Sequence, residues 1–282
     1  MRWDYGKVYQ EIRKSKGLTQ EDVCQDFLAR STLARIESGN TIPKFDTMVF
    51  LLHQIDMSLE EFEYICNLYH PSPRQEIINA IYSQHDLVGT KEIEILQKKC
   101  QDYLKTYHDI PIEHILDILN VVISLRRNGL HNQNDDFQKN TQKIWSYLEK
   151  QNTWYENDLR LLRTIIYYFP IETIKEITPK ILDSLAKYKD FQNIKSCQLS
   201  FLTCLSTIYL YNNLLEDCEK MSSMMLQLSL ELKQYDSLAL SQVRLGICRK
   251  DDDLIKKGLE LLRLTEETAL LKTMEEEIKK FR

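Results

Sequence analysis

Glycine and proline are scarce along this chain, and their scarcity limits the folds open to it. Of 282 residues, 7 are Gly and 6 are Pro, together about 5% where average usage gives about 12%. No glycine occurs between Leu130 and Leu245. Sheet-rich folds need many turns, and turns depend on these two residues. The composition therefore predicts an all-α fold of long helices joined by short connections.

Recognisable motifs for nucleotide and metal chemistry are missing from the sequence. It contains neither the G-x-G-x-x-G nor the G-x-x-x-x-G-K-[ST] loop that cradles phosphates. Its six histidines form no H-E-x-x-H pattern, and its seven cysteines form no C-x-x-C pair and no zinc-like cluster with histidine. We therefore expect a protein that is not an enzyme, with no catalytic residues, no metal site and no cofactor.

The charge is distributed unevenly along the chain. The formal net charge is −5, which gives no global attraction to DNA or to anionic lipid. Residues 1–44 nevertheless carry eight Lys and Arg against six acids, whereas residues 45–67 carry five acids and no Lys or Arg. A nucleic-acid contact is therefore expected only within the first 44 residues.

The 20 residues from Ser196 to Leu215 carry no charge, and this is the length of a membrane span. The stretch contains Gln198, Asn212 and Asn213, however, and polar groups are costly in lipid. We therefore expect a buried helix and the turn after it, with no membrane insertion. The sequence opens with Met-Arg-Trp-Asp rather than an apolar signal segment, so we expect a protein of the reducing cytoplasm.

The first 68 residues have the pattern of five short helices. Gly17 and Gly39 are placed to end the first and the third, and Thr19 is placed to begin the second. Pro71-Ser72-Pro73 then interrupts the pattern, because proline disfavours helical geometry in the residue before it. We therefore predict a first domain over residues 1–68, a linker over 69–73 and a second domain over 74–282.

Beyond the linker, the sequence predicts one helix after another. We expect helices at about 74–85, 91–107, 111–128, 136–150, 154–169, 171–188, 192–211, 214–233, 235–249, 252–263 and 266–281. The starts at Pro111, Trp154, Gln192 and Tyr235 recur at intervals of 43, 38 and 43 residues. Two helices in about 40 residues is typical of helical-pair solenoids, so we predict a TPR-like repeat domain. A single irregular bundle is the alternative, since no consensus repeat letters recur.

Residues 17–39 have the layout of a helix-turn-helix. Leu18, Val23, Leu33 and Ile36 supply the apolar contacts between two helices, and Cys24 is a small residue where the helices must approach. Four polar residues point away from that core on the second helix. Such a helix fits the major groove, where arginine suits guanine edges and Ser or Thr can bind bases or phosphates. The predicted groove-facing residues are Arg30, Ser31, Thr32 and Arg35.

This segment resembles the Cro/C1-type helix-turn-helix family. The family's spacing is matched by Arg13, by Gly17-Leu-Thr-Gln20, by Leu33-x-x-Ile36-Glu37-x-Gly39 and by Pro43. The resemblance implies a structural ion pair between Arg13 and Glu37. A departure is Leu28-Ala29 in the turn, where glycine is frequent in the family. The implied DNA-binding residues are Gln20 at a phosphate or in support of a base contact, Arg30, Ser31 and Thr32 at bases, and Asn40 and Lys44 on the backbone.

The whole chain resembles a narrower group, the Rgg/MutR-type regulators of streptococci and relatives. The resemblance is carried by Arg13-Lys-Ser-Lys-Gly-Leu-Thr-Gln-Glu-Asp-Val-Cys24, by Arg30-Ser-Thr-Leu-x-Arg-Ile-Glu37 and by Met57-Ser-Leu-Glu-Glu-Phe62, followed by about 210 helical residues. Members of this group are cytoplasmic receptors for secreted peptide pheromones, which is quorum sensing. The resemblance implies a homodimer that binds double-stranded DNA at a pseudo-palindromic operator and holds a short hydrophobic peptide on the concave face of its repeat domain.

Two stretches of the repeat domain supply candidate peptide-binding residues. Arg160, Arg163 and Tyr167 share one helix face, where the arginines could clamp a carboxylate or peptide carbonyls. A solvated pair, or salt bridges to Asp158 and Glu172, is the alternative. The uncharged helix adds Asn193, Gln198, Phe201 and Tyr209, for which plain packing is the alternative.

These patterns favour a peptide-responsive transcription regulator. One alternative keeps DNA binding but has the repeat domain sense a small molecule or another protein. Another is a helical-repeat adaptor that docks on a protein partner through its first domain. A peptide-inhibited phosphatase on a similar scaffold lacks support, because no helix-turn-helix is expected there and no metal-ligand set is visible.

Overall fold

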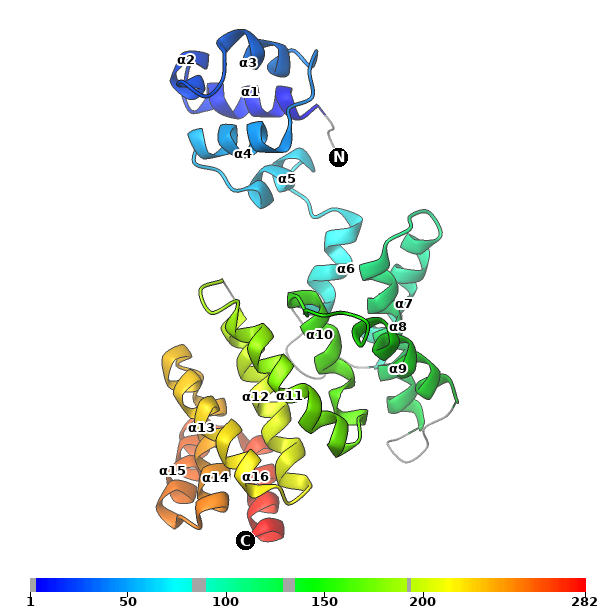
Figure 1. Ribbon diagram of the computed structural model, residues 1–282, viewed down its shortest axis with the longest axis vertical. Helices are drawn as coiled ribbons and strands as arrows, with labels where there is room; N and C mark the ends of the chain where they lie inside the picture. The colour runs from blue at the N-terminus through cyan, green and yellow to red at the C-terminus, as the bar shows by residue number, and fades with distance from the viewer. Residues whose placement is uncertain (1–3, 83–89, 129–134, 192–193) are drawn as a thin grey trace. The chain divides into compact units, whose positions relative to one another are not determined.

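The computed structural model describes residues 4–82, 90–128, 135–191 and 194–282, and every regular element in those ranges is a helix (Figure 1). The prediction of an all-α fold is therefore confirmed. The chain forms two compact units, Met1–Leu116 and Asp117–Arg282. This division falls inside a helix. The linker predicted at 69–73 overlaps a non-helical stretch from Asn67 to Ser72, but its last residue, Pro73, begins the next helix. The partition into functional domains over 1–68 and 74–282 stays a prediction.

The first unit contains the five short helices that the sequence predicts, followed by two more and the start of a third. Buried side chains from the five helices, among them Tyr9, Leu33, Leu51 and Phe62, form one core. Its helices are α1 (Tyr5–Ser15), α2 (Gln20–Cys24), α3 (Arg30–Glu37), α4 (Phe45–Gln54), α5 (Leu59–Cys66), α6 (Pro73–Tyr82), α7 (Thr90–Leu104) and the first turns of α8 (Ile110–Asn128). The predicted helix end at 83–85 lies outside the described residues.

Glycine ends α1 and α3, as the sequence predicts. Gly17 has φ +73° and Gly39 has φ +77°, in the left-handed region that glycine adopts freely. The Gly39 amide donates to the Ile36 carbonyl at 3.0 Å, and the Asn40 amide donates to the Arg35 carbonyl at 2.9 Å. These two bonds make a Schellman motif, which satisfies carbonyls that the helix end would leave without partners.

The start of α1 packs closely against the end of α3 at Gly6. A Cβ atom on Gly6 would lie 1.9 Å from the Ile36 carbonyl oxygen, which is a backbone atom that cannot rotate away. We therefore expect Gly6→Ala to lower the free energy of unfolding by about 1–3 kcal/mol, although alanine is the better helix former. Urea denaturation measures the change, with exposed Lys7→Ala as the control. Equal stability of the two variants would contradict this close approach.

The second unit is a series of helices in which neighbours along the chain pack together. α12 packs on α13, α13 on α14, and α14 on α15, as in a helical-repeat domain. They share one buried core that continues into α16. The remaining bounds are α9 (Asp135–Leu148), α10 (Glu156–Ile165), the 3-10 helix η1 (Ile166–Tyr168), α11 (Ile171–Ala186), α12 (Ile194–Tyr211), α13 (Leu215–Leu232), α14 (Tyr235–Arg249), α15 (Asp252–Leu264) and α16 (Thr268–Phe281).

The helix predicted at 154–169 is shorter than expected. Trp154 is buried, and its indole nitrogen donates to the Leu148 carbonyl at 2.9 Å, so it belongs to the turn before α10. Asp158 accepts the Tyr155 amide at 3.0 Å and thereby fixes the start of α10 at Glu156. The last residues form η1 instead of continuing the α-helix. The predicted start of the next helix at Gln192 lies outside the described residues. No described helix is both long enough and apolar enough to cross a bilayer.

Candidate nucleic-acid interface and ligand-facing residues

A buried ion pair joins α1 to α3. Arg13 Nε donates to Glu37 Oε1 at 2.7 Å, and Arg13 Nη2 donates to Glu37 Oε2 at 2.9 Å. The exposed fractions of the two side chains are 5% and 1%. Gln10 and Gln20 each donate an amide hydrogen to Glu37 Oε2, at 3.0 and 2.8 Å. The predicted pair is therefore present, and it is the centre of a larger hydrogen-bonded cluster.

The cluster holds Glu37 in its charged form. Burial raises the pKa of Glu37, but hydrogen bonds from Arg13, Gln20 and Gln10 outweigh burial and leave that pKa below its ordinary value of 4.5. Since each hydrogen-bond donor comes from α1 or α2, the charge of Glu37 fixes the position of α3 against both helices.

The lowered pKa of Glu37 gives a pH dependence with a defined sign. The stabilising contribution of this carboxylate is complete above its unfolded pKa of about 4.5 and disappears as pH falls through the lower folded value. We therefore expect the melting temperature to fall below pH 4.5. Thermal unfolding followed from pH 7 to pH 3 measures this loss. Glu37→Gln should have a flatter profile in the same range, and an equally steep profile would contradict the assignment.

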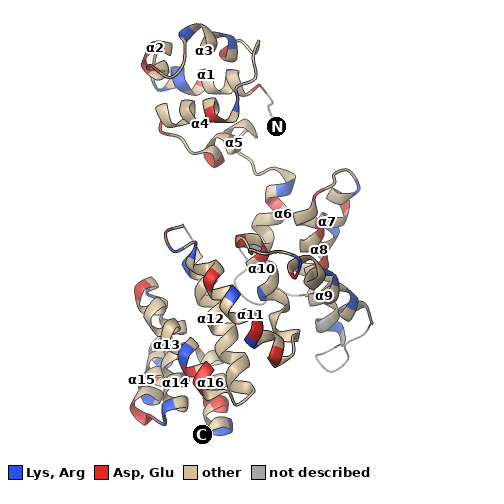
Figure 2. Ribbon diagram, viewed as in Figure 1, with Lys and Arg blue, Asp and Glu red and all other residues tan. Residues whose placement is uncertain are grey.

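The outer face of α3 carries basic and hydroxyl side chains. Arg30, Ser31 and Arg35 are exposed and Thr32 is half-buried, while Leu33 and Ile36 are buried in the core. Neither Arg30 nor Arg35 forms an ion pair with any residue in the described ranges. Figure 2 shows basic residues on α3 and acidic ones on α4 and α5. The helix thus presents two guanidinium groups that are available to an external acceptor.

The other predicted DNA-binding residues border this helix. Asn40 is exposed just after α3, where its side-chain amide donates to Ser38 Oγ at 2.8 Å. Lys44 is exposed immediately before α4. Gln20 begins α2, next to Thr19, which caps that helix as predicted. The amide nitrogen of Gln20 is bound to Glu37. Of the two predictions for Gln20, this contact favours support of a base contact over direct binding of a phosphate.

The turn between α2 and α3 departs from the glycine position that the resemblance implies. Ala29 has φ −64°, an ordinary value for the residue before a helix. The residue with positive φ is Gln25, at φ 45° and ψ −147°, directly after α2. The Gln25 side chain donates to Gln54 Oε1 at 2.7 Å. A glycine-like backbone therefore occurs in this turn, but three residues before Leu28.

The candidate peptide-binding arginines lie on α10, which packs against α12. Arg160 is half-buried and bonds to Glu156, with 2.6 Å between Arg160 Nη2 and Glu156 Oε1, rather than to Asp158 or Glu172. Arg163 is exposed, and it lies near enough to Cys197 and Cys204 on α12 to lower their pKa values against the larger effect of burial, which raises them. Arg160 also lowers the pKa of Cys197, so both arginines lie near α12, and Arg163 is the more exposed of the two.

Tyr167 extends this surface from α10 into η1. Its ring is half exposed, while burial of its hydroxyl and the nearby Cys204 thiol both raise the pKa of Tyr167. Gln198 on α12 is half-buried. Arg163, Tyr167 and Gln198 therefore come from adjoining helices and remain accessible in part.

Two aromatic candidates on α12 belong to the core instead. Phe201 has no exposed surface and packs in the main cluster of the second unit, so a peptide could not contact it in this conformation. The Tyr209 hydroxyl lies 2.8 Å from Thr178 Oγ1 in a buried hydrogen bond. The structure favours the packing alternative for both residues, because α12 buries its apolar residues against several helices at once. Asn193 lies outside the described residues.

Sequence reasoning missed a second buried ion pair beneath this surface. Arg244 on α14 forms a bidentate pair with Glu277 on α16, at 3.1 and 2.8 Å, and both side chains are almost fully buried. The same guanidinium donates to Ser206 Oγ on α12 at 2.7 Å. Three helices therefore meet at one charged group. Arg244 and Glu277 are 33 positions apart on separate helices, so their spacing gives no signal in the sequence.

Two family models match the chain. The Helix-turn-helix model matches residues 10–62. The model for the C-terminal domain of the HTH-type transcriptional regulator Rgg matches residues 94–239, which is more than half of the chain. No curated protein matches the sequence.

Several solved structures share the fold over nearly the full length. A protein from Listeria monocytogenes EGD-e, solved as a candidate transcriptional regulator, superposes with a TM-score of 0.73 at 18% identity and covers 100% of this chain and 98% of its own. The SHP pheromone receptor Rgg2 of Streptococcus dysgalactiae gives 0.72 at 14% identity, with 98% and 100% covered. PlcR of Bacillus thuringiensis, solved with the peptide PapR7 and DNA, gives 0.65 at 15% identity, with 96% and 98% covered.

Proposed function

Because the chain belongs to the Rgg family of HTH-type transcriptional regulators, we propose that it is a cytoplasmic regulator that binds promoter DNA as a homodimer and responds to a short signalling peptide. The proposal assigns DNA binding to the helix-turn-helix unit and peptide binding to the helical-repeat domain. Rgg2 is a pheromone receptor, and PlcR was solved with a peptide and DNA, so the same pair of ligands is the natural expectation here.

The observation that carries the DNA-binding proposal is the outer face of α3. Two exposed guanidinium groups stand on a helix whose inner face is fixed by the buried Arg13–Glu37 pair. A single helix fits the major groove, and arginine binds guanine O6 and N7 in a bidentate manner. In a symmetric dimer, the two α3 helices would contact half-sites about 34 Å apart on a pseudo-palindromic operator.

Salt dependence separates this proposal from a protein-docking adaptor. Each phosphate contact releases counterions, so the logarithm of DNA affinity should fall linearly and steeply with the logarithm of salt concentration. The affinity of a mainly apolar protein interface should change little over the same range. Fluorescence anisotropy of the full chain on the DNA upstream of its own gene gives this slope, and a flat salt response would favour the adaptor.

The surface between α10, η1 and α12 supports the peptide-binding proposal. Arg163 and Tyr167 both lie near Cys204 on α12, Gln198 is on the same helix, and all three keep exposed surface. A guanidinium beside aromatic and amide groups suits a peptide that presents a carboxylate or carbonyl oxygens. Arg160 contributes less, because Glu156 already occupies its guanidinium.

We expect Arg163→Ala to weaken peptide binding by about tenfold or more, since a hydrogen bond to a charged group contributes about 1.5–3 kcal/mol. The measurement titrates the full chain with labelled short hydrophobic peptides encoded beside its gene. Arg263→Ala is the matched control, because it removes an exposed arginine from α15. If no such peptide binds saturably, the regulator that senses a small molecule or another protein becomes the better hypothesis. If the two variants bind a peptide equally well, Arg163 is not a peptide contact.

A further inference from the structure

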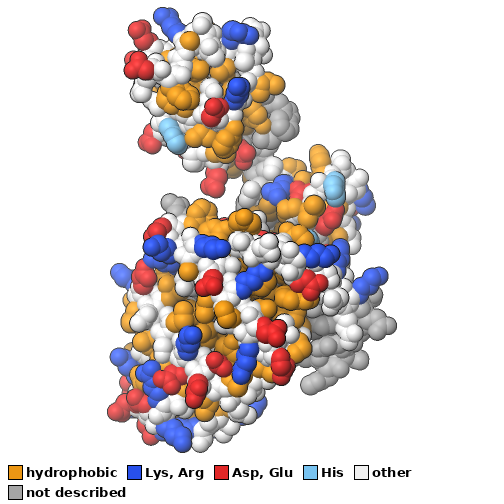
Figure 3. All heavy atoms as spheres, viewed as in Figure 1, with side chains coloured by type: hydrophobic (Ala, Val, Ile, Leu, Met, Phe, Trp, Pro, Cys, Tyr) orange, Lys and Arg blue, Asp and Glu red, His pale blue; other side chains and the backbone are white. Residues whose placement is uncertain are grey.

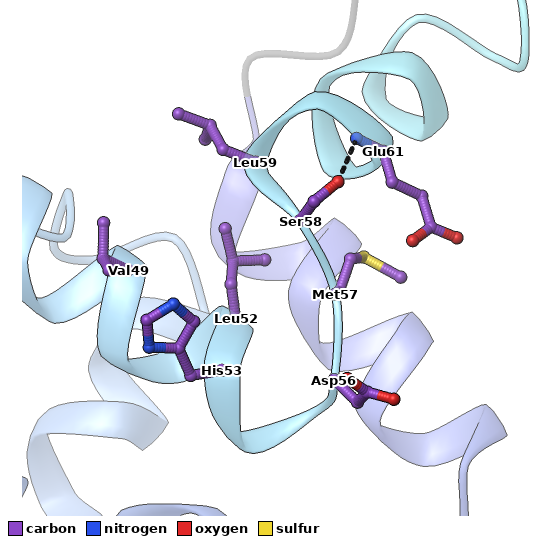
Figure 4. Close-up of a pocket in the computed structure, with 8 residues that line it drawn as sticks. All are labelled: Val49, Leu52, His53, Asp56, Met57, Ser58, Leu59 and Glu61. Carbon is purple, nitrogen blue, oxygen red and sulfur yellow. Dashed lines mark hydrogen bonds between the residues drawn. The ribbon is translucent and has the colours of Figure 1, made fainter. Parts of the chain in front are cut away.

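A groove runs between the end of α4 and the start of α5, and neither proposed ligand accounts for it. Its volume is about 770 Å³. Figure 4 shows Val49 and Leu52 on α4 and Leu59 at the start of α5 with their side chains on the same side, and Met57 in the turn that joins the helices. Leu52 is buried, Val49 and Met57 are half-buried, and Leu59 is 42% exposed. The groove is thus open to the outside, and its apolar side chains stand beside the polar ones of His53 and Ser58.

The helices that form the groove carry charge of one sign. Residues 45–67 contain five acids and no Lys or Arg, and all five acids are exposed. Two of them, Asp56 and Glu61, line the groove itself. Figure 3 shows hydrophobic and acidic side chains side by side on this part of the molecule. An apolar strip with acidic borders is complementary to a partner that has an apolar strip with basic borders.

The groove lies away from the predicted DNA-reading helix. α1 packs against α3 and also against α5, and it separates α3 from α4 and α5 in the ribbon view (Figure 1). DNA phosphates would be repelled by the acidic residues of α4 and α5 but attracted by Arg30 and Arg35. A partner in the groove would therefore leave the outer face of α3 free for DNA.

We propose that the α4–α5 groove is a docking site for a basic amphipathic helix of another protein. Leucine-like side chains spaced i, i+3, i+4 and i+7 would cover Val49, Leu52, Met57 and Leu59, while lysines or arginines on either side would face Asp56 and Glu61. This interaction is independent of the peptide-binding and DNA-binding proposals, and it would connect a DNA-bound regulator to a protein partner.

The probe is a fluorescein-labelled 14-residue peptide of leucine and lysine, with leucines at the spacing given above. Its affinity for the full chain is measured by fluorescence anisotropy. Two comparison peptides separate shape from charge: one has the same composition with dispersed leucines, and the other has glutamate in place of lysine. The amphipathic lysine peptide should bind most tightly, and hydrogen exchange should slow in residues 49–61 when it binds.

Two matched charge-reversal variants test whether the probe peptide binds in the groove. Asp56→Lys/Glu61→Lys reverses two charges in the groove, and Glu260→Lys/Glu276→Lys makes the same charge change on exposed residues of α15 and α16. The groove variant should bind the probe about tenfold or more weakly than the α15–α16 variant, since two attractive contacts become repulsive. Leu59→Ser should weaken binding about fivefold through lost apolar burial.

Circular dichroism and thermal unfolding confirm that each variant is folded before its affinity is compared. Equal affinities for the two charge-reversal variants would overturn the proposal, as would equal binding of the dispersed-leucine peptide. Protection confined to residues outside 49–61 would place the probe elsewhere and also overturn it. Sedimentation that shows a second copy of the chain occupying the groove, with loss of self-association in Asp56→Lys/Glu61→Lys, would replace the basic helix by a homodimer contact.

Discussion

Replacing both Arg30 and Arg35 with alanine is expected to abolish specific operator binding. Each bidentate arginine–guanine contact contributes about 1–3 kcal/mol of discrimination, so the double variant should lose about 2–6 kcal/mol, which is about 30-fold to 10⁴-fold in affinity. Both side chains are exposed on α3 and neither supports the core, so the fold should be unaffected. Gel-shift titration on the DNA upstream of the gene measures the loss, first for each single variant and then for the double.

A matched control separates base contacts from net charge. Lys7→Ala/Lys14→Ala removes two exposed positive charges from α1, in the same unit, without touching α3. Its affinity should decrease only slightly and equally on specific and nonspecific DNA, because such residues act through the general electrostatic attraction. If this control loses as much affinity as the α3 variant, or if Arg30→Ala and Arg35→Ala both bind normally, α3 is not the recognition helix.

Removal of Arg13 alone is expected to destabilise the helix-turn-helix unit more than any surface change. Arg13→Met leaves the Glu37 carboxylate buried with only Gln10 and Gln20 as partners. Breaking a buried pair in this way costs about 3–5 kcal/mol, which is a large fraction of the stability of a small domain. Urea denaturation followed by circular dichroism measures the decrease. DNA affinity should fall with it, because the position of α3 depends on this contact.

The double variant Arg13→Met/Glu37→Leu tests the physical origin of that loss. Two apolar side chains of similar volume remove both charges, so no unpaired ion remains in the core. Stability should return to within about 1 kcal/mol of the original chain. If the double variant is as unstable as Arg13→Met, then lost packing around Arg13 causes the loss of stability, and the unpaired Glu37 carboxylate does not.

The sequence predicts most of the fold because its helix signals are local. Gly17 and Gly39 end helices in the left-handed conformation, and Thr19 caps α2 through a hydrogen bond with the Asp22 amide. Such capping contacts join residues two to five positions apart, so they can be inferred from spacing. The structure also keeps the order and approximate bounds of the predicted helices, with small shifts at the ends where Trp154 and η1 replace α-helical turns.

Features that depend on distant contacts could not be inferred in the same way. Every turn of α12 carries apolar residues, so its sequence does not show which face is exposed; Phe201 and Tyr209 are in fact buried. The Arg244–Glu277 pair joins residues on two different helices, and Gly6 is needed only because α3 passes beside it. The spacing of apolar residues identifies the buried face of a helix when the other faces are polar. It cannot do so when apolar residues occur on every face.

The candidate DNA-binding site is predicted better than the candidate peptide-binding site for the same reason. Arg30, Ser31 and Arg35 lie on the face of a short amphipathic helix opposite Leu33 and Ile36, and the structure leaves all three exposed. The proposed peptide surface instead combines residues of α10, η1 and α12, so its members depend on how separate helices pack. Arg163 and Arg160 look equivalent in the sequence, but in the structure Arg160 is half-buried and bound to Glu156, whereas Arg163 is exposed.

The most direct test of the central claim probes individual atoms of the operator. Each operator guanine is replaced in turn by 7-deazaguanine, which lacks the N7 acceptor, and affinity is measured for the original chain and for Arg30→Ala and Arg35→Ala. We predict that at least one guanine in each half-site lowers the affinity of the original chain by about tenfold when modified, since a good base contact contributes about 1–3 kcal/mol. The variant that lacks the corresponding arginine should be insensitive to the same modification. Equal sensitivity of all three proteins at every guanine would contradict base reading by Arg30 and Arg35.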